Sequence, residues 1–274
     1  KLISDDDLAS LRERDDYQAI FAAPAKPVEV RGKRGSLIVR EGLVVALFTR
    51  GYYRDSCAGL ASMFDDWVSW VPSERLQWSL VGASATQARP FGKRTLSNCR
   101  SMFNPDRRGG KDLVYFTLFG ATAENPGFAF SVHGTNEPED IEEDTERNLV
   151  ELRFPADWLA QVGVDAFVAR VRSWAAGLPG FVSGYADAAL LTTDPVVYNA
   201  TRDQKVAALA QLNPGLDVHE NSGTRIWLAN QCRGAHWLTL LGEPVLAALG
   251  GASAVRGRVD GTDGLTVQQD PGFL

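Results

Sequence analysis

The residues of this chain that could do chemistry are three cysteines, three histidines and one dense run of carboxylates. Cys232 and His236 lie four positions apart. A histidine beside a cysteine can act as the base that forms a nucleophilic thiolate, so this pair is compatible with a cysteine hydrolase. Gly234 intervenes, however, and small buried cysteines are common in protein cores. We therefore interpret Cys232 and His236 as core neighbours and expect no catalytic residue, with a cysteine hydrolase as the alternative.

Residues 137–146, called the acidic run below, carry seven carboxylates in ten positions. Such a run repels itself and cannot be buried, so it forms either a solvated loop or an interaction surface. Its carboxylates are the candidate partner-binding residues of the chain: Glu137, Glu139, Asp140, Glu142, Glu143, Asp144 and Glu146.

Residues 84–111 have the opposite character, because basic side chains alternate there with Phe91 and Phe103. This segment is compatible with a nucleic-acid or anion patch, or with a solvated helix and loop. No motif accompanies the charges, so we favour the solvated interpretation. The net charge of -6 also argues against a nucleic-acid-binding protein, and no nucleic-acid partner is expected. The basic residues are Arg89, Lys93, Arg94, Arg100, Arg107, Arg108 and Lys111.

The sequence contains no motif for a metal site, a cofactor site or a common enzyme class, and no targeting or membrane segment. The histidines are widely spaced and no Cys-x-x-Cys pair is present, so we expect neither a metal nor another cofactor. The signatures of serine hydrolases, phosphate-binding loops, zinc proteases and dinucleotide-binding folds are missing. An odd number of cysteines fits a reducing compartment. No apolar run approaches the ~20 residues that span a bilayer, and no signal peptide is visible, so we expect a cytoplasmic protein without membrane contact.

Both strands and helices are needed to position these residues. Residues 37–48 contain two β-rich runs separated by Glu41-Gly42, which predicts a hairpin, and a second hairpin is predicted over 113–132. Apolar side chains recur at helical spacing over 60–71, before Pro72, and over 165–176. Residues 149–154 alternate apolar and charged side chains, which is typical of a half-buried strand.

The C-terminal part contains shorter elements. Residues 226–228 are β-prone, and residues 237–241 form a second apolar run. Gly242-Glu243-Pro244 predicts the start of a short helix, since proline suits a first helical turn. Gly250-Gly251 predicts its end, and residues 265–267 are a candidate last strand.

These elements predict an α+β fold with a mixed or antiparallel sheet covered by amphipathic helices. We expect one domain over residues 1–274. Residues 43–81 and 149–191 each run strand, helix, strand, so two similar halves, 37–135 and 148–251, remain an open alternative.

Two segments carry a resemblance to a known family. They are Leu47-Phe-Thr-Arg-Gly-Tyr-Tyr-Arg54, with the tryptophan-containing helix after it, and Asn230-Gln-Cys-Arg-Gly-Ala-His-Trp-Leu-Thr-Leu-Leu-Gly-Glu-Pro244. With these segments the chain resembles the type VI secretion immunity proteins from about residue 37 to 251. The more specific motif is Gly-x-x-Trp-Leu-Thr-x-Leu-Gly-x-Pro, and its residues look like determinants of the fold.

The resemblance implies a non-enzymatic protein that binds and neutralises a cognate toxin effector. Some relatives are paired with nuclease toxins of restriction-endonuclease-like type. A nuclease surface is shaped for phosphates, and a carboxylate-rich loop can imitate that charge, so the acidic run is the expected contact. The alternatives are the cysteine hydrolase and a nucleic-acid-binding module that uses the basic segment.

Overall fold

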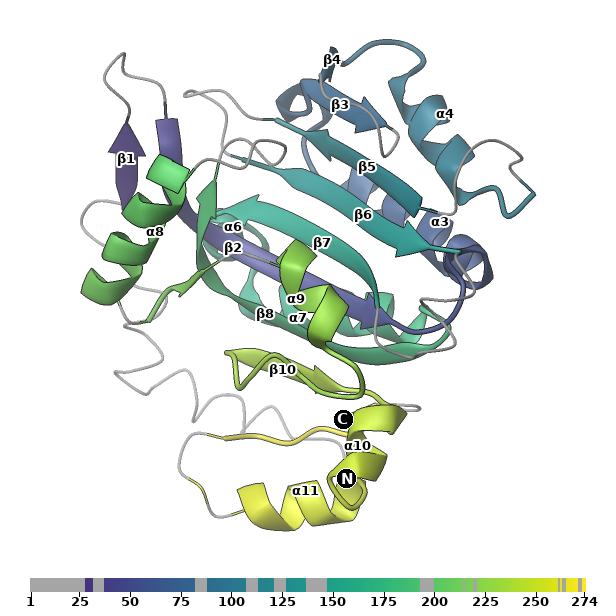
Figure 1. Ribbon diagram of the computed structural model, residues 1–274, viewed down its shortest axis with the longest axis vertical. Helices are drawn as coiled ribbons and strands as arrows, with labels where there is room; N and C mark the ends of the chain where they lie inside the picture. The colour runs from purple at the N-terminus through teal and green to yellow at the C-terminus, as the bar shows by residue number, and fades with distance from the viewer. Residues whose placement is uncertain are drawn as a thin grey trace.

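One large, predominantly antiparallel sheet forms the centre of the protein (Figure 1). The computed structural model describes residues 28–31, 37–81, 88–106, 113–120, 127–136, 147–192, 200–213, 215–218, 221–260, 262, 265–270 and 273–274. The strands follow one another across the sheet in the order β10-β8-β2-β7-β6-β5-β3-β4, with β1 added beside β2 and β9 beside β8. The α+β fold expected from the sequence is confirmed.

The strands of the sheet differ widely in length. They are β1 (Glu29–Arg31), β2 (Leu37–Thr49), β3 (Trp78–Val81), β4 (Arg89–Pro90), β5 (Leu113–Phe119), β6 (Ala129–Thr135), β7 (Asn148–Pro155), β8 (Phe181–Thr192), β9 (Asp217–Val218) and β10 (Leu238–Leu241). Each neighbouring pair is antiparallel except β8 and β9. The predicted hairpin over 113–132 is confirmed as β5 and β6.

β2 is the central strand, and the hairpin predicted within it is wrong. Its thirteen residues run without a turn between β7 and β8. Gly42 pairs with Ala189 of β8, and a Cβ atom on Gly42 would lie 2.5 Å from the Leu191 side chain. The glycine therefore permits a close approach of neighbouring strands and does not mark a turn.

The helices of the described part of the chain differ in length, and α3 is the longest with 18 residues. They are α3 (Tyr53–Trp70), α4 (Thr95–Arg100), α6 (Trp158–Val162), α7 (Val164–Ala176), α8 (Ala200–Leu212), α9 (Asn221–Trp227), α10 (Glu243–Ala248) and α11 (Ala252–Val259), with 3-10 turns η1 (Ser73–Arg75) and η2 (Ser101–Phe103). The helices predicted over 60–71 and 165–176 are confirmed as parts of α3 and α7.

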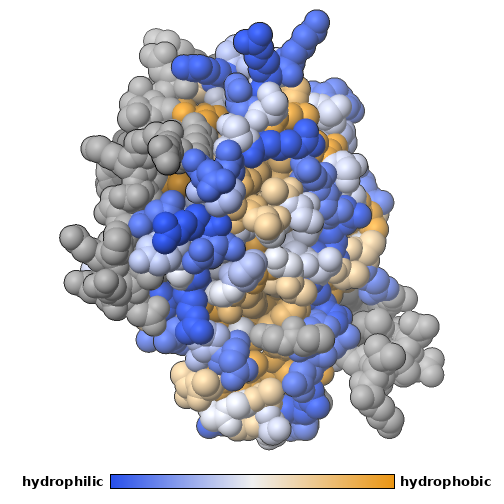
Figure 2. Space-filling view, turned by 90° about the vertical axis from the view of Figure 1, so that its right-hand side faces the viewer, coloured by the Kyte–Doolittle hydropathy of each residue, from blue (hydrophilic) through white to orange (hydrophobic). Residues whose placement is uncertain are grey.

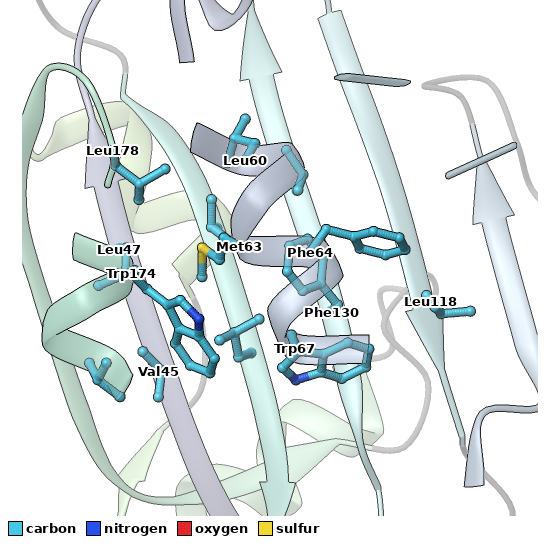
Figure 3. Packing of buried hydrophobic residues seen from close by; sticks show 14 of the residues in the cluster. Val45, Leu47, Leu60, Met63, Phe64, Trp67, Leu118, Phe130, Trp174 and Leu178 are labelled. Carbon is cyan, nitrogen blue, oxygen red and sulfur yellow. The ribbon is translucent and has the colours of Figure 1, made fainter. Parts of the chain in front are cut away.

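The main core lies between one face of the sheet and helices α3, α6 and α7, which are behind the sheet in Figure 1. Phe64 and Trp67 of α3 lie beside Phe130 of β6, and Val45 of β2 lies beside Trp174 of α7 (Figure 3). Burial of a large apolar side chain contributes roughly 1.5–3 kcal/mol. This cluster is therefore the main source of stability.

The opposite face of the sheet carries a smaller core. Val44 and Phe48 of β2 point there and pack with Leu228, which directly follows α9. α9 lies in front of the sheet in Figure 1. α8 covers one end of the sheet, where Val206 packs against Val39 and Leu190.

The strand predicted over 149–154 is confirmed as β7, but the prediction that it is half-buried is wrong, because β7 is buried on both faces. Glu151 and Arg153 point away from the main core, yet both are buried. Arg153 Nε donates to Glu151 Oε1 over 2.9 Å, and Arg153 Nη1 donates to the Thr192 carbonyl over 3.1 Å. Because the two charges satisfy each other, the strand tolerates their burial.

The C-terminal part departs from the sequence-based expectations at two points. Residues 226–228 are not a strand, because Ile226 and Trp227 end the helix α9. Residues 265–267 form no strand either. The apolar run at 237–241 contains β10, and the short helix expected after it is confirmed as α10. Gly250 and Gly251 both have positive φ, as a helix stop requires.

Candidate functional site

The acidic run itself lies outside the described residues, but the structure describes both of its flanks. Asn136 precedes it after β6, and Arg147 and Asn148 follow it at the start of β7. Asn148 Oδ1 accepts a hydrogen bond from the Thr135 amide over 2.9 Å, which ties the two flanks together. Asn148 Nδ2 donates to the Gly51 carbonyl over 2.9 Å.

The flank before the run is held by the start of α3. The Arg54 amide donates to Asn136 Oδ1 over 3.0 Å. Gly51 and Arg54 belong to the first of the two resemblance segments, residues 47–54. Residues that connect β2 to α3 thus position both Asn136 and Asn148.

The flank after the run is held by α9 and the turn that follows it. Arg147 is 1% exposed, and its Nε donates to the Ala229 carbonyl over 2.7 Å. Its Nη2 donates to Asn230 Oδ1 over 3.2 Å. Its amide donates to the Arg225 carbonyl over 3.1 Å, and Arg225 Nη1 donates back to the Arg147 carbonyl over 3.3 Å.

Both resemblance segments therefore contact the flanks of the acidic run. The first segment contacts Asn136 through Arg54 and Asn148 through Gly51, and the second contacts Arg147 through Asn230. Sequence reasoning missed Arg147 and Asn148. Their only signal was a polar Arg-Asn pair directly before the alternating pattern of residues 149–154, and a polar pair does not reveal its partners.

The structure engages His236 with residues other than Cys232. Within the described part of the chain no hydrogen bond joins His236 to Cys232, and His236 Nδ1 contacts Asp187 Oδ2 at 2.9 Å instead. The imidazole stacks on the Tyr185 ring, with 3.9 Å between the ring centroids. Arg233 donates to the Tyr185 hydroxyl and to Asp217 Oδ2. This polar network joins β8, β9 and the segment before β10, which indicates a structural role for His236.

The two other cysteines are poor nucleophiles. Burial raises the pKa of the Cys99 thiol to about 12. Burial, together with the nearby Asp55 carboxylate, raises the pKa of Cys57 to about 11. Both thiols stay protonated near neutral pH, whereas nucleophilic attack requires the thiolate.

The described part of the basic segment does not form an aromatic and basic platform. Arg89, Lys93 and Arg94 are exposed, but Arg100 pairs with Asp65 over 2.6 Å. Phe103 is buried against Phe64, so it is not available to stack on a base. Arg107, Arg108 and Lys111 lie outside the described residues.

A partly open pocket of about 260 Å³ lies between the C-terminal end of α7, the start of β8 and α10. Its lining is both polar and apolar, with Arg50 and Glu243 as the charged residues. Figure 2 shows the side of the molecule on which α10 lies, where hydrophobic patches alternate with strongly hydrophilic ones.

The described residues contain no group of three or more His, Cys, Asp or Glu side chains that could hold a metal ion. No described helix is long and apolar enough to cross a membrane.

Comparison with known families gives a match over most of the chain. Residues 61–272 match the family TsiV, described as type VI immunity for VRR-NUC. The chain belongs to the TsiV family. The match includes the acidic run, Arg147 and the α9–β10 segment, whereas residues 47–54 precede it.

A solved structure shares the TsiV fold seen here. The type VI secretion (T6SS) protein PA0821 of Pseudomonas aeruginosa superposes with a TM-score of 0.69 at 19% sequence identity. The alignment covers 89% of this chain and 69% of PA0821. No curated protein sequence matches the chain. The TsiV assignment confirms the resemblance to type VI secretion immunity proteins.

Proposed function

We propose that this protein neutralises a cognate VRR-NUC nuclease toxin by binding it directly, one to one and without catalysis. The observation that carries the proposal is the match of residues 61–272 to the TsiV family. The contacts of the candidate catalytic residues support the proposal that neutralisation involves no catalysis. His236 is engaged by Asp187, and the thiols of Cys57 and Cys99 stay protonated near neutral pH.

The acidic run is the contact surface that we propose. A nuclease binds phosphates, so the surface that it uses must attract negative charge. Seven carboxylates in ten residues present that charge, and they lie in a chain whose net charge is already -6. Complementary fields of this kind raise the association rate and align the partners.

The hydrogen bonds at the ends of the run support its use as a binding segment. Asn136 and Asn148 are tied to the β2–α3 connection, and Arg147 is tied to α9. A binding segment whose ends are fixed to the sheet loses less conformational freedom on binding than one with free ends. We also propose that the encounter takes place in the cytoplasm, because a nuclease toxin must reach cellular nucleic acid.

The experiment is a charge reversal within the run, Glu139→Lys, Glu142→Lys and Glu143→Lys together. We expect the Kd for the toxin to rise by about tenfold to a hundredfold at low salt, which corresponds to about 1.4–2.8 kcal/mol. Cells that carry this variant should be killed at a lower level of toxin expression than cells that carry the unaltered protein. Affinity is measured by titration calorimetry with the purified, catalytically inactivated toxin.

A matched control reverses three exposed carboxylates elsewhere on the surface, with Glu74→Lys, Asp106→Lys and Asp260→Lys. The change in net charge is the same, so a general electrostatic effect would weaken both variants equally. Unchanged affinity of the Glu139, Glu142 and Glu143 variant at low salt would exclude the run as the contact. Failure of the unaltered protein to bind the toxin would exclude direct neutralisation.

A further inference from the structure

Trp227 is the last residue of α9, and its side chain is 83% exposed. The other tryptophans of the chain are less exposed: Trp67, Trp158 and Trp174 are at most 6% exposed, and Trp70, Trp78 and Trp237 are half-buried. Tryptophan is the largest apolar side chain and is the type most enriched among the residues that dominate binding energy in protein interfaces. A solvent-exposed tryptophan at a helix end is therefore a candidate anchor for a partner.

The neighbours of Trp227 hold its backbone in place. Two residues before it, Arg225 is buried and exchanges main-chain and side-chain hydrogen bonds with Arg147. Directly after it, Leu228 is 4% exposed and packs against the sheet. The chain thus buries the residues around Trp227 while Trp227 itself points outward. Because the backbone on both sides of Trp227 is already fixed, less conformational entropy is lost when the tryptophan binds a partner.

The turn after Trp227 departs from ordinary backbone geometry. Ala229 has φ of +44°, in the left-handed region that side chains other than glycine rarely occupy. Its carbonyl accepts the hydrogen bond from the buried Arg147 Nε. Such conformations persist only where surrounding contacts enforce them, and they cluster at functional sites. The strained turn and the buried guanidinium together fix the direction in which α9 ends.

We propose that Trp227 is the aromatic anchor through which the protein docks on its VRR-NUC toxin. This inference rests on the proposed function. The occupant is the toxin because Arg147, which holds the α9 turn, directly follows Glu146 at the end of the acidic run. A nuclease surface that complements this charge would carry Lys or Arg side chains. Such cations also bind favourably over an indole face.

The anchor and the acidic run make different kinetic predictions. An anchor in a desolvated pocket acts mainly on the dissociation rate, whereas exposed charges act mainly on the association rate and its salt dependence. The test measures both rate constants for the full-length protein and the inactivated toxin by biolayer interferometry, at low and at high salt. The variants are Trp227→Ala, Trp227→Phe and, as a matched control, Leu212→Ala at the end of α8, where the leucine is 78% exposed.

For Trp227→Ala we expect the dissociation rate to rise at least about tenfold, with the salt dependence of association unchanged and the thermal midpoint equal to that of the unaltered protein. The dissociation rate of Trp227→Phe should lie between those of the unaltered protein and Trp227→Ala. The dissociation rate of Leu212→Ala should stay within about twofold of the unaltered value. If the unaltered protein binds the toxin and Trp227→Ala dissociates as slowly, the anchor is excluded while the proposed function stands. If the unaltered protein does not bind at all, both fail.

Discussion

At the scale of single residues, close contact between strands decides what each position of the sheet tolerates. A Cβ atom added to Gly42 would lie 2.5 Å from Leu191 Cδ1 and 2.7 Å from the Phe154 carbonyl oxygen. Gly184 of β8 faces the same restriction, 2.6 Å from Leu47 Cδ2. These glycines are needed for interstrand packing, although both lie in extended backbone that other residues could adopt.

The Gly42→Ala variant should therefore unfold more easily, by about 1–3 kcal/mol, because the methyl group overpacks a buried site on both sides. The control is Gly257→Ala in α11, where an added Cβ meets no atom within 4 Å. That change should leave the free energy of unfolding equal or raise it by up to about 1 kcal/mol, since alanine is the better helix former. Urea titrations of both variants make the comparison. Equal stability of the two would contradict the overpacking at Gly42.

At the scale of elements, α3 and α7 share one face of the sheet and are joined by Asp66. Asp66 Oδ2 accepts a hydrogen bond from Trp174 Nε1 over 2.7 Å, and Asp66 Oδ1 pairs with Arg170 over 3.1 Å. The Arg170 guanidinium lies over the Trp70 ring, 4.6 Å from its centroid. Trp174 is 4% exposed, so its N–H depends on Asp66 as a partner. This contact connects the two helices beyond apolar packing alone.

The Asp66→Ala variant should lose about 1–2 kcal/mol of stability, because the buried indole N–H loses its acceptor. Its sequence neighbour provides the control. Asp65 pairs with Arg100 over 2.6 Å, but the side chains of both residues are about half exposed. Exposed ion pairs contribute little, so Asp65→Ala should cost less than about 1 kcal/mol. Thermal unfolding followed by circular dichroism distinguishes the variants, and a larger loss for Asp65→Ala would refute this account of Asp66.

At the scale of the whole molecule, the order of strands links the two halves suggested by the repeated strand, helix, strand pattern. β2 belongs to the first half, yet its neighbours along residues 42–49 are β7 and β8, both from the second half. Separation of the halves would expose both edges of β2, the central strand. The main core also takes residues from α3 and α7 together.

We therefore predict that residues 37–135 and 148–251, produced separately, do not fold. Each fragment should lack a cooperative unfolding transition, whereas the full chain should unfold in one step. Mixing the two fragments should restore part of the native circular dichroism, because β2 can then insert between β7 and β8. A fragment 37–135 that unfolds cooperatively by itself would contradict the expectation of one domain.

Local patterns determined much of this protein from the sequence alone. The apolar spacing of α3 and α7, the hairpin of β5 and β6 and the proline at the start of α10 depend on neighbours within a few turns of the chain. The acidic run is predicted to be solvated or partner-bound for a similar reason, since dense charge cannot be buried. The α+β class and the family segments also follow from the sequence.

Features that depend on distant partners were decided only by the tertiary structure. Gly42 marks a turn in the local pattern, and only the approach of Leu191 and Phe154 shows that it serves packing. The burial of Glu151 and Arg153 depends on their mutual ion pair and on Thr192. The same holds at the acidic run. Its charge is a property of the sequence, but Arg147 meets the carbonyl of Ala229, beside the exposed Trp227, only because the strand order brings residues about eighty positions apart into hydrogen-bond distance.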